Sequence, residues 1–167
     1  LSNSIDLERI EGDTAVFSVF EAFNSNTLTS LDVSPLIDNS TSDIELLVMG
    51  DLLRRSNNID GMITVYNAYK KNNPNVLNIN LPLAQALLVN NDFKKAKELV
   101  TPVLARFSKN PMANYLNSLI LLSENKHDEA YSAISLADTY GIDMPSVSLT
   151  KGLLEFNSQN YESALSS

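Results

Sequence analysis

The sequence of 167 residues contains no cysteine and a single histidine, His127. Without cysteine the chain cannot form disulfides, use a thiol nucleophile or bind a metal through thiolates. With one histidine it cannot build a multi-histidine metal site either. Its five glycines are isolated from one another, so there is no glycine-rich loop of the kind that holds phosphate groups.

The polar residues that remain do not indicate catalysis. A serine triad would need His127, and the sequence contains no Gly-x-Ser-x-Gly motif. The neighbouring carboxylates of Asp128 and Glu129 lie at an expected helix start, where they interact favourably with the helix dipole. We therefore predict a non-enzymatic chain without catalytic residues, cofactor or metal site.

Long hydrophobic runs and an excess of basic residues are also lacking. The run Leu119–Leu122 is far shorter than the roughly 18 residues of a membrane-spanning helix, so no membrane insertion by this chain is expected. The net charge is −8, and residues 1–42 carry seven acidic side chains against one basic side chain. A nucleic-acid-binding surface is usually basic, so nucleic acid is not an expected partner.

The clearest positive feature is a spacing of 34 residues that recurs along the chain. A bulky position after each polar turn is occupied by Ile59, Phe93, His127 and Tyr161. Two small positions are occupied by Gly50, Ala84, Ser118 and Gly152, and by Met62, Ala96, Ala130 and Ala164. Three columns with one period indicate a repeat array, in which each unit contacts only its neighbours.

Apolar residues spaced by three and four predict the helices of this array. Pro102 lies inside one of them and is expected to kink or break it locally. Gly141 is expected to end another in a left-handed C-cap. At the N-terminus we expect a helix over residues 12–24, with a strand over 14–20 as the alternative, because Val and Phe also favour strands. The expected helices span residues 44–55, 60–71, 79–89, 93–108, 112–123, 127–140 and 147–156, with a further helix beginning at Tyr161.

Two helices per repeat, small residues at the helix crossing and a proline after the second helix resemble the tetratricopeptide repeat (TPR) family. The resemblance covers residues 43–167, with Pro74 at the closing proline position. It departs from the family pattern in lacking tryptophan, in Met62, and in Asn114 and Asn117, which leave the register of helix 112–123 open by one residue. The resemblance implies an all-α fold, a right-handed superhelix of antiparallel helix pairs (an α-solenoid).

The period also predicts the domain organisation. Residues 1–42 form an N-terminal acidic segment, which we expect to be a helical, degenerate capping repeat. Complete repeats are expected at 43–76, 77–110 and 111–144. A further repeat begins at 145–167 and breaks off within its second helix, as in a fragment of a longer array.

The TPR family binds protein partners in a concave groove, and the first helices here carry more apolar residues than the small-residue columns require. Part of this stripe could pack between units, but the excess favours a binding groove. Arg54 could hold an acidic peptide end, although no later unit has a matching base. The expected partner-binding residues are Leu47, Arg54, Leu81, Leu88, Tyr115, Leu119, Leu122, Leu149 and Phe156.

These features predict a scaffold that binds a peptide segment, a partner protein or another copy of itself. The alternative is a regulatory or substrate-recruiting domain of a larger enzyme, or of an exopolysaccharide or cell-envelope export system. A glycan or lipid groove is a third possibility. Residues 110–137 also resemble bacterial TPR lipoproteins associated with exopolysaccharide and PEP-CTERM sorting systems. That resemblance implies a periplasmic or membrane-anchored location outside the cytoplasm, while a cytoplasmic location stays open.

Overall fold

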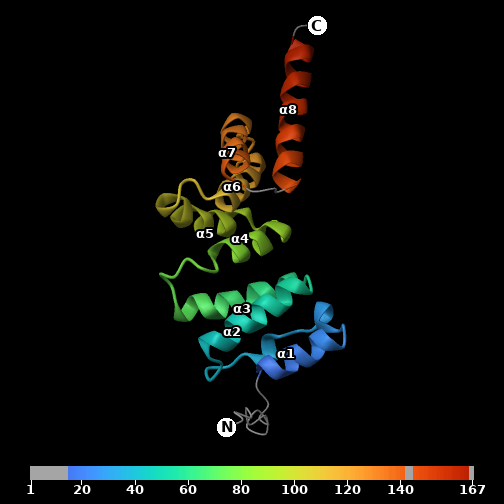
Figure 1. The fold of residues 1–167 in the computed structure, drawn as a ribbon, viewed down its shortest axis with the longest axis vertical. Helices are drawn as coiled ribbons and strands as arrows, with labels where there is room; N and C mark the ends of the chain where they lie inside the picture. Colours follow the sequence, from blue (N-terminus) through green and yellow to red (C-terminus); the bar gives the residue numbers. More distant parts are fainter. Residues whose placement is uncertain (1–14, 142–144, 166–167) are drawn as a thin grey trace, which may run out of the picture. The chain divides into compact units, whose positions relative to one another are not determined.

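The computed structural model describes residues 15–141 and 145–165, with side chains described as far as Phe156. Every regular element in these ranges is helical, and none is a strand (Figure 1). The chain divides into two compact units, residues 1–76 and 77–167. The all-α fold of helix pairs predicted by the 34-residue period is confirmed.

In its described residues, 15–76, the first unit contains three α-helices and two short 3-10 turns. They are α1 (Ala15–Asn24), η2 (Leu28–Ser30), η3 (Ser34–Leu36), α2 (Asp43–Arg55) and α3 (Ile59–Asn72). Helix α2 packs against both α1 and α3. Because α1 is helical, the alternative of a strand over 14–20 is wrong for its described residues. Residues 1–14 of the expected capping repeat lie outside the described residues.

The start of α2 shows how local sequence places a helix. The hydroxyl of Ser42 accepts a hydrogen bond from the backbone N–H of Glu45, and the Glu45 carboxylate accepts one from the N–H of Ser42 at 2.7 Å. This capping box satisfies two backbone donors that would otherwise lack partners. From there Met49 and Leu53, which are fully buried, direct one face of α2 into the core.

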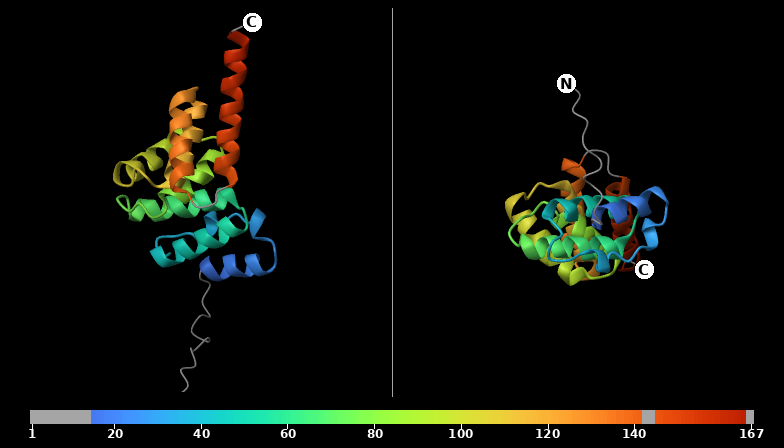
Figure 2. Two further views of the ribbon diagram at one scale, coloured as in Figure 1. Left: turned by 45° about the horizontal axis from the view of Figure 1, so that its top comes forward. Right: turned by 90° about the horizontal axis from the view of Figure 1, so that it is seen from below.

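The second unit contains α4 (Asn80–Val89), α5 (Phe93–Arg106), α6 (Pro111–Ser123), α7 (His127–Tyr140) and α8 (Pro145–Leu165). Helix α4 pairs with α5, and α6 pairs with α7. Helix α6 also packs against α4 and α5, while α8 packs against α7 (Figure 2). The small residues Ala84, Ala96, Ser118 and Ala130 are fully buried, which is where closely approaching helices need them.

Helix α5 runs unbroken through Pro102, so the predicted local break is absent, while the alternative of a kink at Pro102 stays a prediction. Pro102 is exposed, while Val100 and Val103 beside it are buried and hold the helix in place. Gly141 has φ −81° and ψ 145°, which is an extended conformation and not the left-handed C-cap. Its N–H instead donates to the carbonyl of Ala137 at 2.7 Å.

Among the described residues, the left-handed backbone conformation is adopted by four asparagines. Asn26, Asn57, Asn91 and Asn125 have φ of 60°, 55°, 58° and 58°. At Asn125 the N–H donates to the carbonyl of Leu122, and the next N–H donates to that of Leu121, both at 3.0 Å. This is the Schellman arrangement, which occupies carbonyls left free at a helix end. Asparagine tolerates this conformation better than most residues because its short amide can bond locally.

The left-handed turn also sets the sign of a testable change. Replacing Asn125 with glycine is expected to leave the free energy of unfolding unchanged or raise it, because glycine adopts positive φ without strain. Alanine at the same position is expected to lower it by about 1 kcal/mol. Thermal denaturation followed by circular dichroism measures the difference. Equal melting temperatures for the two variants would contradict this role.

The predicted break of the last repeat into two helices is wrong. Helix α8 runs from Pro145 to Leu165 without a turn, so no new helix begins at Tyr161. Position 159, one period after Asn125, holds glutamine, which favours the helical region and lacks the ease of asparagine in a left-handed turn. The side chains of Tyr161 and Ala164 lie outside the described residues.

The open register of α6 is resolved. Ser118 is fully buried, so α6 keeps the 34-residue register. Asn114 is buried where the family usually has an apolar residue, and its side-chain amide donates to the carbonyls of Ser108 (2.8 Å) and Asn110 (2.9 Å). Because these bonds satisfy the amide, the polar residue is compatible with the core.

Candidate protein-binding surface

In the first unit, the predicted surface consists of Leu47 and Arg54 on α2. Leu47 is half-buried and Arg54 is exposed. Arg54 and Arg55 share one carboxylate: Arg54 Nη2 lies 2.6 Å from Asp51 Oδ1, and Arg55 Nε lies 2.8 Å from Asp51 Oδ2. The hydrogen bond from Arg54, followed by the charge of Arg55, holds the pKa of Asp51 below its usual value.

A carboxylate of a partner would therefore have to compete with Asp51 for Arg54. Such exposed pairs contribute little stability, typically about 0–1 kcal/mol, so they exchange readily. The prediction that Arg54 binds an acidic peptide end stays a prediction, and the ion pair weakens its basis.

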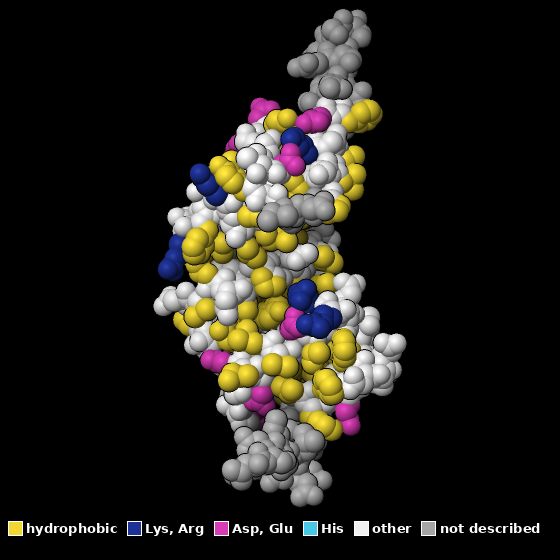
Figure 3. All heavy atoms as spheres, viewed as in Figure 1, with side chains coloured by type: hydrophobic (Ala, Val, Ile, Leu, Met, Phe, Trp, Pro, Cys, Tyr) yellow, Lys and Arg dark blue, Asp and Glu magenta, His cyan; other side chains and the backbone are white. Residues whose placement is uncertain are grey.

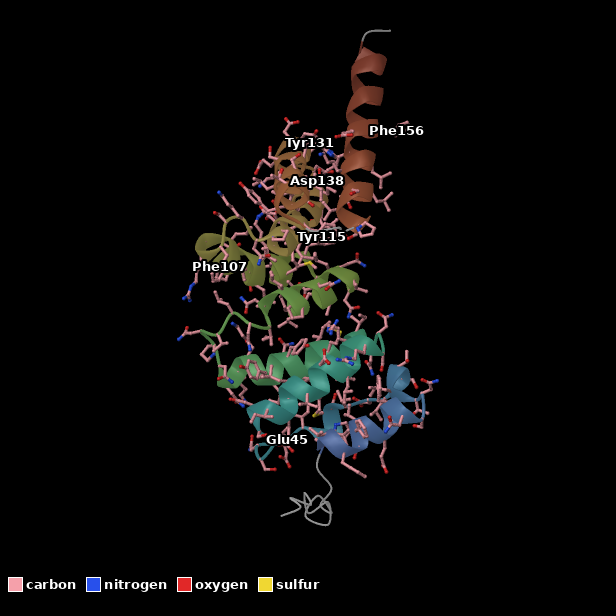
Figure 4. All side chains as sticks on the ribbon, viewed as in Figure 1. Glu45, Phe107, Tyr115, Tyr131, Asp138 and Phe156 are labelled. Carbon is pink, nitrogen blue, oxygen red and sulfur yellow. The ribbon has the colours of Figure 1, made fainter. Side chains whose placement is uncertain are left out.

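In the second unit, five predicted residues lie on the neighbouring helices α4 and α6. Leu81, Leu88 and Leu119 are half-buried, with part of each side chain accessible. Tyr115 and Leu122 are also partly buried, but they pack against a core cluster formed by α6, α7 and α8. Tyr115 lies at the base of these helices in Figure 4. The structure thus leaves the three leucines as the stronger candidates for contact with a partner.

The two predicted residues on α8 are the most accessible of the set. Leu149 and Phe156 are 66% and 62% exposed, and Phe156 lies on the side of α8 away from α7 (Figure 4). Leu153, between them, is 56% exposed. The nine predicted residues therefore do not share one environment, because they include an ion-paired arginine, half-buried leucines, core-packed residues and an exposed stripe.

Exposed apolar residues of α2 were not predicted as binding residues. Ile44 and Val48 lie four positions apart, a spacing that puts them on one face of the helix, and both are exposed. In the sequence, Ile44 and Val48 are an apolar pair spaced by four residues, and neither occupies a small position of the repeat. Buried residues of a helix have the same spacing, so the sequence alone does not identify this pair as exposed.

The basic cluster on α5 is largely ion-paired. Lys95 lies 2.7 Å from the carboxylate of Asp92, and Lys97 bonds to Glu124, which also binds Lys126 at 2.9 Å. The hydrogen bond from Lys97, and then that from Lys126, keeps the pKa of Glu124 below its usual value. These pairs lie on the solvent side, as expected of a solvated face.

In the described part of the chain, no group of three or more histidine or acidic side chains could hold a metal ion. His127 is exposed at the start of α7, whereas Ile59 and Phe93, which have the same place in their repeats, are half-buried. No described helix is both long and apolar enough to cross a bilayer.

Comparison with known proteins identifies the fold alone. No protein-family model and no curated protein matches the sequence. Among solved structures, MamA 41-end from Desulfovibrio magneticus RS-1 matches with a TM-score of 0.67 and 16% identity, over 93% of this chain and 91% of that chain. The MamA RS-1 ArsTM double mutant matches with the same score and identity, over 93% and 90%. This likeness supports the TPR-type fold, and it does not support the narrower resemblance to PEP-CTERM-type lipoproteins.

Proposed function

We propose that the chain is a non-enzymatic scaffold that binds an apolar or amphipathic segment of a protein partner. In the second unit, the binding residues are Leu81 and Leu88 on α4 and Leu119 on α6. The observation that carries the proposal is their partial exposure beside fully buried neighbours. Ala84 and Ser118 on the same helices fill the helix crossings and are fully buried. The three leucines lie outside these crossings, and the accessible part of each is available to a partner.

The chemistry of this surface favours a protein partner. Leucine side chains offer apolar contact without charge, which suits the apolar face of an amphipathic helix. Helix α4 carries no acidic or basic residue in its first or last turn, so charge contributes little to recognition there. Of the other predicted residues, Leu47 and Arg54 lie on α2 in the first unit and are not part of this proposed surface.

The test is affinity capture from a lysate of the source organism, with the Leu81→Glu/Leu88→Glu double variant as the altered bait. Val89→Glu is the matched control, since Val89 is an exposed apolar residue at the end of the same helix. We expect partners captured by wild type and control to be reduced at least about tenfold on the double variant, a loss of about 1.4 kcal/mol. Circular dichroism checks that all three baits are folded.

Identical protein sets on the wild-type and double-variant baits would refute the proposed surface. Loss of the same proteins from the Val89→Glu bait would show that added charge, and not the loss of the leucines, causes the effect. A purified captured protein then allows a dissociation constant to be measured for each variant.

A further inference from the structure

Helix α8 carries a continuous apolar stripe on its outer side. Leu149, Leu153 and Phe156 are spaced by four and three residues, so they lie on one face of the helix. Val147 and Leu154, which are buried with residues of α6 and α7, lie on the opposite face. Figure 3 shows hydrophobic side chains along the outer edge of this helix. The described part of α8 thus has apolar residues on two opposite faces, one buried against the unit and one exposed.

Gly152 lies beside this stripe and has the same place in the repeat as Gly50, Ala84 and Ser118. Those three are buried, and a Cβ at Gly50 would meet the ring of Tyr66 on α3. At Gly152, by contrast, an added Cβ would have nothing within 4 Å in the described part of the chain. Glycine is unfavourable inside an exposed helix, and it is useful where another backbone approaches closely. Gly152 therefore has the properties of a helix-crossing position whose partner helix is absent.

The charged side chains in the described part of α8, Lys151 and Glu155, are directed toward α7. Lys151 Nζ lies 2.6 Å from the carboxylate of Asp138 on α7. Glu155 accepts a hydrogen bond from the hydroxyl of Tyr131, also on α7, at 3.1 Å. The stripe itself is uncharged, so its partner must offer an apolar surface with room for a close approach.

We propose that the stripe pairs with the α8 stripe of a second copy of this chain, with the two helices antiparallel. Residues 149, 152, 153 and 156 are spaced symmetrically about the midpoint between 152 and 153. A two-fold axis at that midpoint places Leu149 of each copy opposite Phe156 of the other. It also places each Gly152 beside the Leu153 of the other copy. Two-fold interfaces require such a self-complementary patch.

This pairing extends the proposed function and uses a different surface from the leucines of α4 and α6. The two surfaces can therefore fail separately. Variants of α8 should abolish self-association and leave capture of other proteins intact, whereas Leu81→Glu/Leu88→Glu should do the reverse.

Sedimentation velocity of the 167-residue chain, over subunit concentrations up to about 1 mM, tests the pairing. We expect a concentration-dependent monomer–dimer equilibrium in the wild type. Leu153→Glu should weaken it at least about tenfold, while Val89→Glu, an exposed apolar position outside the stripe, should leave it unchanged. A wild type that stays monomeric throughout, or a Leu153→Glu variant that dimerises like the wild type, would overturn the proposal.

The geometry is tested by disulfide trapping, which the absence of native cysteine makes direct. A mixture of Leu149→Cys and Phe156→Cys chains should form a disulfide-linked heterodimer under mild oxidation. Each variant alone should link to itself much less, because antiparallel pairing separates identical positions. Stronger linkage of Leu149→Cys to itself than to Phe156→Cys would exclude the antiparallel arrangement.

Discussion

Replacing Asn58 with leucine is expected to destabilise the first unit by about 3 kcal/mol, because three hydrogen bonds are lost from a buried site. The Asn58 amide donates to the carbonyls of Leu28 (2.7 Å) and Leu31 (3.0 Å), and its oxygen accepts from the N–H of Gly61 at 2.8 Å. One side chain thus caps α3 and connects that helix to the segment around η2. Leucine has the same number of side-chain heavy atoms, branched at the same carbon, so the substitution leaves no cavity and the loss reports mainly the hydrogen bonds.

Asn58→Asp separates the two roles of this residue. Aspartate can still accept from the N–H of Gly61, as Asp92 accepts from the N–H of Lys95 one repeat later. It cannot donate to the two carbonyls while ionised, so an intermediate loss of stability is expected. Urea denaturation followed by circular dichroism measures both variants. If the aspartate variant is as stable as wild type, the bonds to Leu28 and Leu31 contribute nothing.

Gly50→Leu is the second substitution with a large expected effect, a loss of about 3 kcal/mol from overpacking. A Cβ at Gly50 would lie 2.7 Å from Cζ of Tyr66, which is itself almost fully buried on α3. The remaining atoms of leucine would force α2 and α3 apart. Gly50→Ala should cost less than Gly50→Leu, because it adds only the Cβ that meets the Tyr66 ring and because alanine favours the helix by about 1 kcal/mol relative to glycine.

Gly152→Ala is the matched control, since it occupies the same place in the repeat but meets open space in the described residues. In dilute protein it should raise the free energy of unfolding by up to about 1 kcal/mol. Opposite signs for Gly50→Leu and Gly152→Ala would establish that the repeat position is crowded only where a second helix covers it. A Gly50→Leu variant that melts with the wild type would rule out tight α2–α3 contact at this point.

The residues of α8 illustrate what sequence pattern can and cannot determine. The period of 34 residues placed Leu149 and Phe156 in the same columns as Tyr115 and Leu122. In the structure the α6 pair packs against the core cluster, whereas the α8 pair is exposed. The columns are equivalent in the sequence, but their exposure depends on whether a following helix lies against them.

The left-handed residues at helix ends were predicted wrongly. The sequence pattern favoured Gly141 after α7, which is extended, whereas asparagines in the turns within the helix pairs take the left-handed conformation. The asparagines at 57, 91 and 125 follow the repeat period, so the signal was present. The replacement of asparagine by glutamine at 159 was likewise visible, and it coincides with the continuous helix α8.

By itself, the sequence determined the helical class, the repeat length, most helix boundaries and the small residues at the helix crossings. These properties are local or periodic, because helix formation depends on neighbouring residues and each crossing repeats the same contact. Only the tertiary structure decided which apolar residues remain accessible, and that Asn58 is buried in a site where it bonds to Leu28 and Leu31. Burial and such hydrogen bonds depend on residues distant in the chain, and a one-dimensional pattern contains no direct measure of that proximity.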